Sequence, residues 1–336
     1  MTVARPVAIV TGGAGFIGSH MVDCLLGRGY RVRVIDNLVG GRESNLAAHA
    51  TNPDLAFERA DIRDLEPGAA VFADAAMVFH FAGIGDIVPS IERPTEYMAT
   101  NVQGTVRVLE AARAARVRKL VYAASSSCYG LAATPTREDH PIAPQYPYAL
   151  SKFMGEEAAL HWHRVYRLPV NSIRIFNAYG TRVRTTGAYG AVFGVFFKQK
   201  LSGTPFTVVG DGSQRRDFVY ASDVAEAFLR AAETPLSGEI WNLGAGNPQS
   251  VNRLVELIGG PVTYIPKRPG EPEITWADIG KITGDLGWQP RISFEEGVGL
   301  MTAEIDKWRD APLWDPDSIA RATRVWFNYL GAGPTP

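Results

Sequence analysis

The chain has 336 residues, of which 46% are hydrophobic and 21% are charged, a composition typical of a globular protein with one large core or two. Its 34 basic residues balance 35 acidic ones, and the net charge of −1 excludes a general electrostatic attraction to nucleic acid or to a membrane surface. Cys24 and Cys128 are too few for a disulfide framework, and the sequence has neither a leader-like start nor an 18-residue apolar run, so we expect a cytoplasmic protein.

Short apolar segments alternate with helical patterns through the first half of the chain. The predicted strands are 7–11, 31–36, 77–82, 119–124 and 170–176, and the predicted helices between them are 17–27, 95–115 and 149–166. Strands separated by helix-length connections form a parallel sheet with helices on both faces. The sequence therefore predicts an α/β fold with a doubly wound parallel sheet over residues 1–180.

The second half of the chain has a less regular pattern, with more glycine and proline. We expect residues 181–336 to form a smaller mixed α/β lobe for substrate binding, with 214–235 returning to the first domain. The segment "FTVVGDGSQRRDF" predicts a hairpin around residues 210–213.

We assign no function to two other segments, residues 161–163 and 314–331. His161 and His163 are two positions apart and point to different sides of a helix, and no acid or cysteine completes a ligand set, so no metal site is predicted. Residues 314–331 carry apolar side chains at helical spacing, including Ile319 and Trp326, and predict a docking helix.

A glycine-rich loop directly follows the first predicted strand and opens the first helix. The segment "TGGAGFIGSH" (11–20) places glycines at 13, 15 and 18, with another at 12, in the dinucleotide-binding pattern. Glycine lets the backbone turn tightly and approach a pyrophosphate, whose charge is favoured at the start of the helix. Asp36, at the end of the second strand, is placed to accept hydrogen bonds from ribose hydroxyls and to repel a 2′-phosphate, which favours NAD over NADP. Arg42, a few residues on, keeps the NADP alternative open.

Eight further motifs follow the glycine loop in order along the chain. They are "ADIRD" (60–64), "HFAG" (80–83), "NVQGT" (101–105), "SSSCYG" (125–130), "PYALSK" (147–152), "RIFNAYG" (174–180), "RRDFVYASDVAEA" (215–227) and "RPGEPEITWADIGK" (268–281). With them the chain resembles the extended short-chain dehydrogenase/reductase family, in particular its NAD-dependent nucleotide-sugar epimerases and dehydratases, from Val7 to about Phe294. The resemblance implies a Rossmann domain. It also implies an NAD site formed by Gly12, Gly15, Phe16, Ile17, Gly18, Asp36, Asn37, Asp61, Ile62, Phe81, Ala82, Gly83, Asn101, Tyr148 and Lys152.

Tyr148 and Lys152 lie four positions apart after Pro147, so a helix places both side chains on one face. Such a pair also arises by chance on exposed helices, but the resemblance implies that these residues are the catalytic pair. A nearby ammonium and a positively charged nicotinamide both favour the phenolate, so we expect a lowered pKa for Tyr148. The phenolate would accept a proton from a sugar hydroxyl, while Lys152 holds the nicotinamide ribose. The resemblance implies Ser125 as the third catalytic residue, with Ser126 as the alternative.

The reaction depends on the residues that follow the catalytic hydroxyl. Dehydratases of the family carry Asp-Glu there and decarboxylating relatives carry Glu, whereas this chain has Ser126 and Ser127. The resemblance therefore implies epimerisation of a nucleotide-diphosphate sugar at carbon 4 through a 4-keto intermediate, with a UDP-hexose or a UDP-N-acetylhexosamine as substrate. A 4,6-dehydratase and a non-catalytic NAD-binding regulatory protein are the alternatives.

The resemblance also implies which residues hold the substrate. They are Ser126, Ser127, Asn177, Arg216, Arg268, Glu271 and Thr275. Asn177 and Arg216 would contact the diphosphate, and Arg268 and Glu271 would contact phosphate and ribose. Thr275 would face carbon 2 of the sugar, where a small side chain leaves room for an N-acetyl group. The family's equivalents of helices 95–115 and 149–166 form a four-helix interface, so we expect a homodimer.

Overall fold

The computed structural model describes residues 5–186, 192–267 and 271–330. Its largest element is a seven-stranded sheet in the order β11-β6-β5-β4-β1-β2-β3, with every neighbouring pair parallel. The strands are β1 (Val7–Thr11), β2 (Arg31–Asp36), β3 (Leu55–Arg59), β4 (Ala75–His80), β5 (Lys119–Ser125), β6 (Val170–Ile175) and β11 (Ile240–Leu243). This is the Rossmann strand order, which confirms the predicted fold class.

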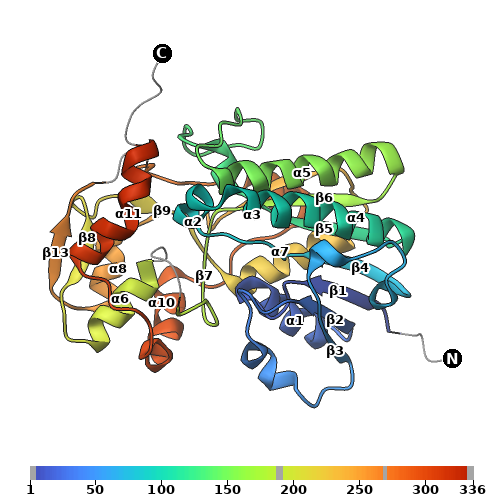
Figure 1. The fold of residues 1–336 in the computed structure, drawn as a ribbon, viewed down its shortest axis with the longest axis horizontal. Coiled ribbons are helices and arrows are strands. Elements are labelled where there is room, and N and C mark those ends of the chain that lie inside the picture. The colour runs from blue at the N-terminus through green and yellow to red at the C-terminus, as the bar shows by residue number, and fades with distance from the viewer. Residues whose placement is uncertain (1–4, 187–191, 268–270, 331–336) are drawn as a thin grey trace.

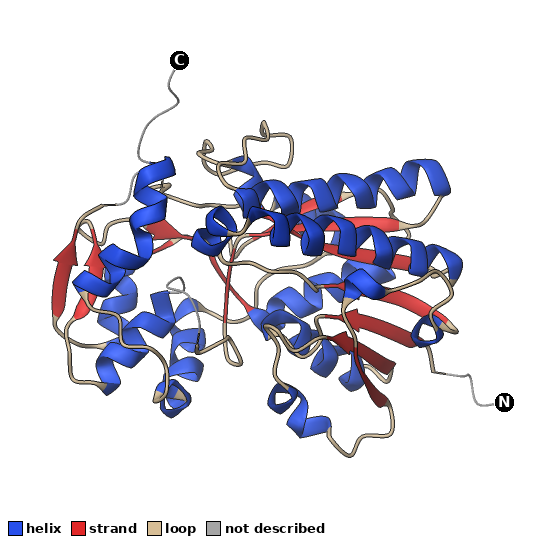
Figure 2. Ribbon diagram, viewed as in Figure 1, coloured by secondary structure: helices blue, strands red, loops and turns tan. Residues whose placement is uncertain are grey.

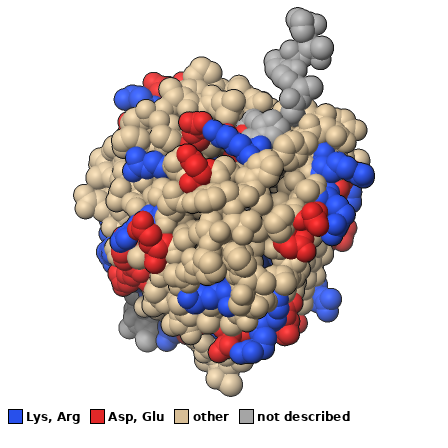
Figure 3. All heavy atoms as spheres, turned by 90° about the vertical axis from the view of Figure 1, so that its left-hand side faces the viewer, with Lys and Arg blue, Asp and Glu red and all other residues tan. Residues whose placement is uncertain are grey.

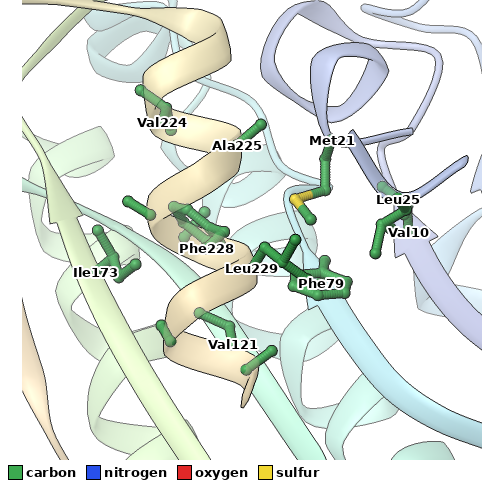
Figure 4. Close-up of a cluster of buried hydrophobic side chains, with 14 of the residues drawn as sticks. Val10, Met21, Leu25, Phe79, Val121, Ile173, Val224, Ala225, Phe228 and Leu229 are labelled. Atoms are coloured by element: carbon green, nitrogen blue, oxygen red, sulfur yellow. The ribbon is translucent and has the colours of Figure 1, made fainter. Parts of the chain in front are cut away.

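Helices cover both faces of the sheet (Figure 1). On one face α1 (Phe16–Gly27) packs against α7 (Ala221–Glu233), and on the other α4 (Thr105–Ala114) packs against α5 (Pro147–Tyr166). Each face has its own apolar cluster. Figure 4 shows the first, in which Phe228 of α7 lies among residues from α1 and from the strands. These two layers hold the carboxyl ends of the strands in fixed positions.

All five predicted strands are present in the seven-stranded sheet. Two further strands of this sheet, β3 and β11, were not predicted. β3 is an edge strand whose side chains are mostly exposed, so it lacks the apolar run that marks a buried strand. β11 has only four residues, including the buried polar residue Asn242. The predicted helix 95–115 is divided into α3 (Pro94–Met98), a π-helical turn η4 (Ala99–Gly104) and α4. The π-helical turn η4 is wider than an α-helical turn, and such turns are frequent at functional sites.

The smaller lobe is built around a third apolar cluster. Figure 2 shows that this lobe has a pair of strands separate from the large sheet. Its elements include α6 (Val192–Leu201), β8 (Phe206–Val209), α8 (Val251–Ile258), β13 (Val262–Ile265), α10 (Phe294–Ala303) and α11 (Pro316–Leu330). The remaining short elements are η1 (Glu43–His49), η2 (Ile62–Asp64), η3 (Ala70–Phe72), α2 (Ile87–Glu92), η5 (Ser126–Tyr129), β7 (Asn177–Tyr179), β9 (Arg215–Arg216), β10 (Phe218–Tyr220), β12 (Gln249–Ser250), α9 (Gly280–Leu286) and η6 (Ile305–Trp308). α11 confirms the predicted C-terminal helix.

The predicted hairpin around residues 210–213 is wrong. β8 pairs with β13 in parallel, while β9 pairs with β12 antiparallel, so the segments on either side of the turn have different partners. Gly210 and Gly212 do turn the chain, with φ of 61° and 75°. A turn sequence predicts a change of chain direction, whereas side-chain packing determines which strand pairs with which. Here Phe206 of β8 stacks on Phe196 of α6 at a centroid distance of 4.9 Å.

The surface of the smaller lobe carries charges of both signs. Figure 3 shows Lys and Arg interspersed with Asp and Glu over the face turned to the viewer. Many of these charges form ion pairs, such as Arg253 with Glu295 at 3.0 Å. Among the residues that the structure describes, no helix is long and apolar enough to cross a membrane.

Candidate active site

The glycine loop after β1 has a geometry that only glycine permits. Gly12 has a φ of +69°, and a Cβ there would lie 2.7 Å from the backbone nitrogen of Ala82. A Cβ on Gly18 would lie 2.1 Å from the carbonyl oxygen of Gly12. The loop therefore brings β1, the end of β4 and the first turn of α1 into close contact, and any larger side chain would open this arrangement.

The start of α1 offers backbone donors. Its N-cap is Gly15, which supplies no side-chain hydrogen bond, so the N–H groups of Phe16, Ile17 and Gly18 have no capping partner within the helix. Such a helix start favours an anionic ligand through its N–H groups and its dipole. This part of the site fits the pyrophosphate of a dinucleotide.

The adenosine end of the site lies at the carboxyl ends of β2 and β3. Asp36 is buried, and its carboxylate accepts from the N–H of Ala14 at 3.0 Å and from that of Leu38 at 2.8 Å. Asn37 donates to the carboxylate of Asp61 at 2.8 Å, so two predicted cofactor residues are in direct contact. The carboxylate as a whole retains acceptor capacity for a ribose hydroxyl.

Arg42 is engaged elsewhere, which removes the reason to expect a phosphate on that ribose. Its guanidinium donates to the carbonyl of Val183 at 3.0 Å and to the hydroxyl of Thr185 at 3.2 Å. The buried carboxylate of Asp36 is therefore the charge closest to the expected ribose, and it fits NAD.

The predicted cofactor residues after β4 are hydrogen-bonded to the start of the glycine loop. The N–H of Phe81 donates to the carbonyl of Thr11 at 3.1 Å, and that of Ala82 to the Thr11 hydroxyl at 3.3 Å. A Cβ on Gly83 would lie 2.9 Å from the side-chain oxygen of Asn101, which is buried. The side chain of Ile62 is also buried in the core, so only its backbone is available for an adenine.

Tyr148 and Lys152 lie in the first turns of α5, as predicted. Tyr146 is the N-cap and Pro147 is the first helical residue, a position that suits proline because its missing N–H needs no partner. Ser125, at the end of β5, is hydrogen-bonded to the Ser127 hydroxyl at 2.7 Å. Of the two candidate serines, Ser125 is the one whose side chain lowers the pKa of Tyr148.

The pKa of Tyr148 does not follow our expectation. Burial raises it, and the hydrogen bond from Ser125 opposes that rise without reversing it. The lowered pKa that we predicted is therefore wrong for the groups that the protein itself supplies. A positively charged nicotinamide beside the phenol is the remaining source of such a shift.

Lys152 is 7% exposed, and burial lowers its pKa to about 8, an effect opposed by the negative charge of Glu156 one turn later. Its ammonium lies 4.5 Å from the centre of the Tyr122 ring, and it is close to Gly83, where a Cβ would be 3.8 Å from Nζ. Lys152 is therefore mostly charged at neutral pH and lies against the strand ends where the nicotinamide ribose is expected.

Two pairs of predicted substrate residues are in direct contact. Arg216 donates to the carboxylate of Glu271 at 2.8 Å, and Thr275 donates to the side-chain oxygen of Asn177 at 2.7 Å. These residues come from β7, β9 and the segment after 270, so the fold joins three distant parts of the sequence. Arg268 lies outside the described residues.

One aromatic residue of this region was missed from the sequence. Tyr146 has its ring parallel to that of Tyr148, at an interplanar angle of 8° and a centroid distance of 6.3 Å. The sequence signal for it is its position as the residue before Pro147, two residues before Tyr148.

The parallel sheet, the uncapped helix start and the tyrosine–lysine pair define a dinucleotide-dependent enzyme of the Rossmann class. The family model "NAD dependent epimerase/dehydratase family" matches residues 8–244. The UDP-glucose 4-epimerase of Mycolicibacterium smegmatis is 37% identical over 299 residues, which cover 86% of this chain and 95% of that protein.

Solved structures agree with the sequence match. The UDP-N-acetylglucosamine 4-epimerase of Methanobrevibacter ruminantium, in complex with UDP-N-acetylmuramic acid, has a TM-score of 0.85 at 30% identity and covers 91% of this chain and 98% of its own. The UDP-glucuronic acid 4-epimerase of Bacillus cereus, in complex with UDP-glucuronic acid and NAD, has a TM-score of 0.82 at 30% identity, with coverages of 90% and 99%. The chain belongs to the NAD-dependent epimerase/dehydratase family, and its cofactor is NAD.

Proposed function

We propose that this protein is an NAD-dependent 4-epimerase of a UDP-linked hexose or N-acetylhexosamine. The observation that carries the proposal is the place of Tyr148 and Lys152 in the first turns of α5, with Ser125 at the end of β5 acting on the phenol. The 4-epimerases among the similar proteins support the same reaction. We further propose that residues 1–180, with the return of 214–235, hold the cofactor and that 181–336 hold the nucleotide sugar.

In this mechanism Tyr148 exchanges one proton with the sugar. Its phenolate oxygen accepts the proton of the carbon-4 hydroxyl, with Ser125 beside it, and the resulting phenol returns the proton after the keto sugar has turned over. Lys152 holds the ribose next to the reacting carbon and keeps a positive charge near the phenol. Bound NAD supplies the acceptor and donor for hydride and a positive ring that favours the phenolate. Proton and hydride both return to the sugar, so the net change is inversion at carbon 4.

The residues after Ser125 favour epimerisation over the alternatives. A dehydratase must move a proton at carbon 5, which requires a carboxyl group, and Ser126 and Ser127 have none. The Ser127 hydroxyl is bonded to that of Ser125 at 2.7 Å. A regulatory protein without activity would not need Tyr148 and Lys152 in this arrangement.

A panel of nucleotide sugars tests the proposal. The purified protein is incubated with UDP-hexoses and UDP-N-acetylhexosamines, and inversion at carbon 4 is followed by NMR. A 4-keto-6-deoxy product, detected by its ultraviolet absorbance in alkali, would show a dehydratase instead. Absence of turnover on every sugar of the panel would remove the epimerase proposal.

Thr275→Tyr is expected to reduce activity on N-acetylated sugars far more than on simple hexoses. Thr275 lies against Asn177, and we propose that its small side chain leaves room for the N-acetyl group. Overfilling a packed site costs about 1–3 kcal/mol, or roughly 5- to 150-fold in activity. Ratios of kcat/KM for the two substrates measure the effect, with Thr275→Ser, which keeps the hydroxyl, as the control. An unchanged ratio in the tyrosine variant would place the pocket elsewhere.

Lys152→Arg is expected to remove the alkaline decline in turnover. Burial lowers the pKa of Lys152 to about 8, so its ammonium is present at neutral pH and is lost as the pH rises through that value. A guanidinium stays charged throughout this range. Turnover measured from about pH 6 to about pH 10 should therefore fall above about pH 8 in the parent protein only. The same decline in both proteins would assign it to another group.

We propose that the chain forms a homodimer through α4 and α5. Leu150 and Met154 of α5 are 39% and 41% exposed, an apolar surface that a partner helix pair would cover, whereas Leu160 of the same helix is buried within the chain. Sedimentation should give twice the chain mass of 36.5 kDa. Met154→Glu should produce the monomer, while Leu300→Glu on α10 should leave the dimer intact; a monomeric parent protein would contradict the proposal.

The location of the protein is inferred from its cysteines. Cys24 and Cys128 form no disulfide in the structure. Burial raises the pKa of the Cys128 thiol to about 12, so it remains protonated and unreactive. We propose a cytoplasmic enzyme.

A further inference from the structure

The C-terminal helix α11 lies across the smaller lobe and packs on α2, as Figure 1 shows at the upper left. At its start the carbonyl of Trp314 accepts a hydrogen bond from the buried side chain of Gln199 at 2.7 Å, which attaches the segment to α6. Ile319, Thr323 and Trp326 are the buried residues of the helix, at the spacing of one helical face. α11 is therefore fixed at both ends, to the smaller lobe and to the residues around α2.

Trp326 of this helix reaches the start of the catalytic helix. Its ring is 6.0 Å from the ring of Tyr146, centroid to centroid, with an interplanar angle of 42°. Tyr146 in turn lies parallel to Tyr148, with an interplanar angle of 8°. One chain of ring contacts thus connects α11 to the phenol that we assign to proton transfer.

The Tyr146 hydroxyl also experiences the charges of the residues expected to hold the diphosphate. Burial raises its pKa, the charge of Glu271 raises it further, and that of Arg216 lowers it. If Tyr148 meets carbon 4 of the sugar and Arg216 meets the diphosphate, the sugar ring extends between them. Tyr146 lies parallel to Tyr148 at one end of that span, which places it beside the sugar.

The helix α2 gives a second link to the same place. Asp86, directly before α2, pairs with Arg184 at 2.8 Å and accepts at its carbonyl from the Tyr97 hydroxyl at 2.7 Å. The Tyr97 ring lies 6.5 Å from that of Tyr148, centroid to centroid. α11 therefore packs on a helix that is linked to the ring of Tyr148 through Asp86 and Tyr97.

We propose that Tyr146 is a specificity-determining wall of the sugar site and that Trp326 of α11 is the residue that positions its ring. This inference rests on the proposed epimerase function. Tyr146 contacts the sugar, whereas Trp326 acts only through Tyr146. Aromatic contacts of this kind are directional, so removing Trp326 frees the Tyr146 ring to turn away from its place.

The test is a double-mutant cycle of Trp326→Ala and Tyr146→Ala in the full-length, NAD-loaded protein. Values of kcat and KM are measured with UDP-glucose and UDP-N-acetylglucosamine, together with dissociation constants for both sugars, bound NAD and the melting temperature. Trp326→Ala is expected to reduce kcat/KM about ten- to a hundred-fold and to change the ratio between the two sugars at least about fivefold, since small misplacements at a reacting centre have effects of this size. In the Tyr146→Ala background the same substitution should have almost no further effect.

Three controls separate positioning from general stability. Phe327→Ala removes a neighbouring aromatic ring that is 39% exposed, and it should leave kinetics and sugar ratio unchanged. Trp326→Phe keeps a ring against Tyr146 and should restore most of the activity. Bound NAD should be the same in every variant.

The inference is overturned if the effects of Trp326→Ala and Tyr146→Ala are additive. It is also overturned if the ratio of kcat/KM between the two sugars stays constant, because a fall in turnover that only follows a lower melting temperature would reflect stability. A parent protein without turnover on either sugar would contradict the proposed function but not decide this inference by itself. The dissociation constants of the same four proteins then decide it, because coupling between Trp326 and Tyr146 in sugar affinity does not require turnover.

Discussion

Tyr148→Phe is expected to reduce turnover about 10²- to 10⁴-fold while NAD and the nucleotide sugar stay bound, because a general acid–base group contributes about that much to the rate. The substitution removes only the hydroxyl, and the ring keeps its contacts with Tyr146 and Tyr97. Single-turnover rates, bound NAD and the affinity for the sugar nucleotide together distinguish lost chemistry from lost binding.

Tyr166→Phe is the matched control for that prediction. Tyr166 ends the same helix α5 and is 47% exposed, so its hydroxyl has no part in the site. The control should keep full turnover. A loss of less than about tenfold in Tyr148→Phe would remove Tyr148 from the proton-transfer role.

Local sequence patterns predict which segments meet on the cofactor side of the proposed site. The glycine loop, Asp36 and the Tyr148–Lys152 pair depend on short segments, and each segment has one place in a doubly wound sheet. The carboxyl ends of parallel strands meet at one edge, so Asn37 and Asp61 come into contact although they are 24 positions apart. Residues that act from strand ends are therefore predictable once the strand order is known.

Contacts between distant elements were not predictable in the same way. The contact between Trp326 and Tyr146 joins residues 180 positions apart in sequence, and the periodicity of α11 predicts a helix without naming its partner. β3 and β11 were missed since one is exposed and the other is short and polar. The pKa of Tyr148 depends on how far burial outweighs its hydrogen bond, which is a property of the packed structure.

Arg174→Met is expected to lower the free energy of unfolding by about 3–5 kcal/mol, because it leaves the carboxylate of Glu156 buried without its partner. The two side chains are 4% and 1% exposed, and the guanidinium donates to the carboxylate at 2.6 Å. Arg174 also donates to the hydroxyl of Tyr129 at 2.7 Å. Urea unfolding followed by circular dichroism measures the change as a lower midpoint.

The double variant Arg174→Met/Glu156→Leu shows what the pair does beyond stability. Apolar replacement of a whole buried pair is often neutral or stabilising, so the midpoint should recover largely. Yet Glu156 lies one turn after Lys152 and its charge raises the pKa of that lysine, which burial alone would lower further. The double variant should therefore lose turnover at a lower pH than the parent protein. Recovered stability with an unchanged pH profile would mean that Glu156 only supports the packing of α5. A shifted profile would show that the carboxylate of Glu156 keeps Lys152 charged.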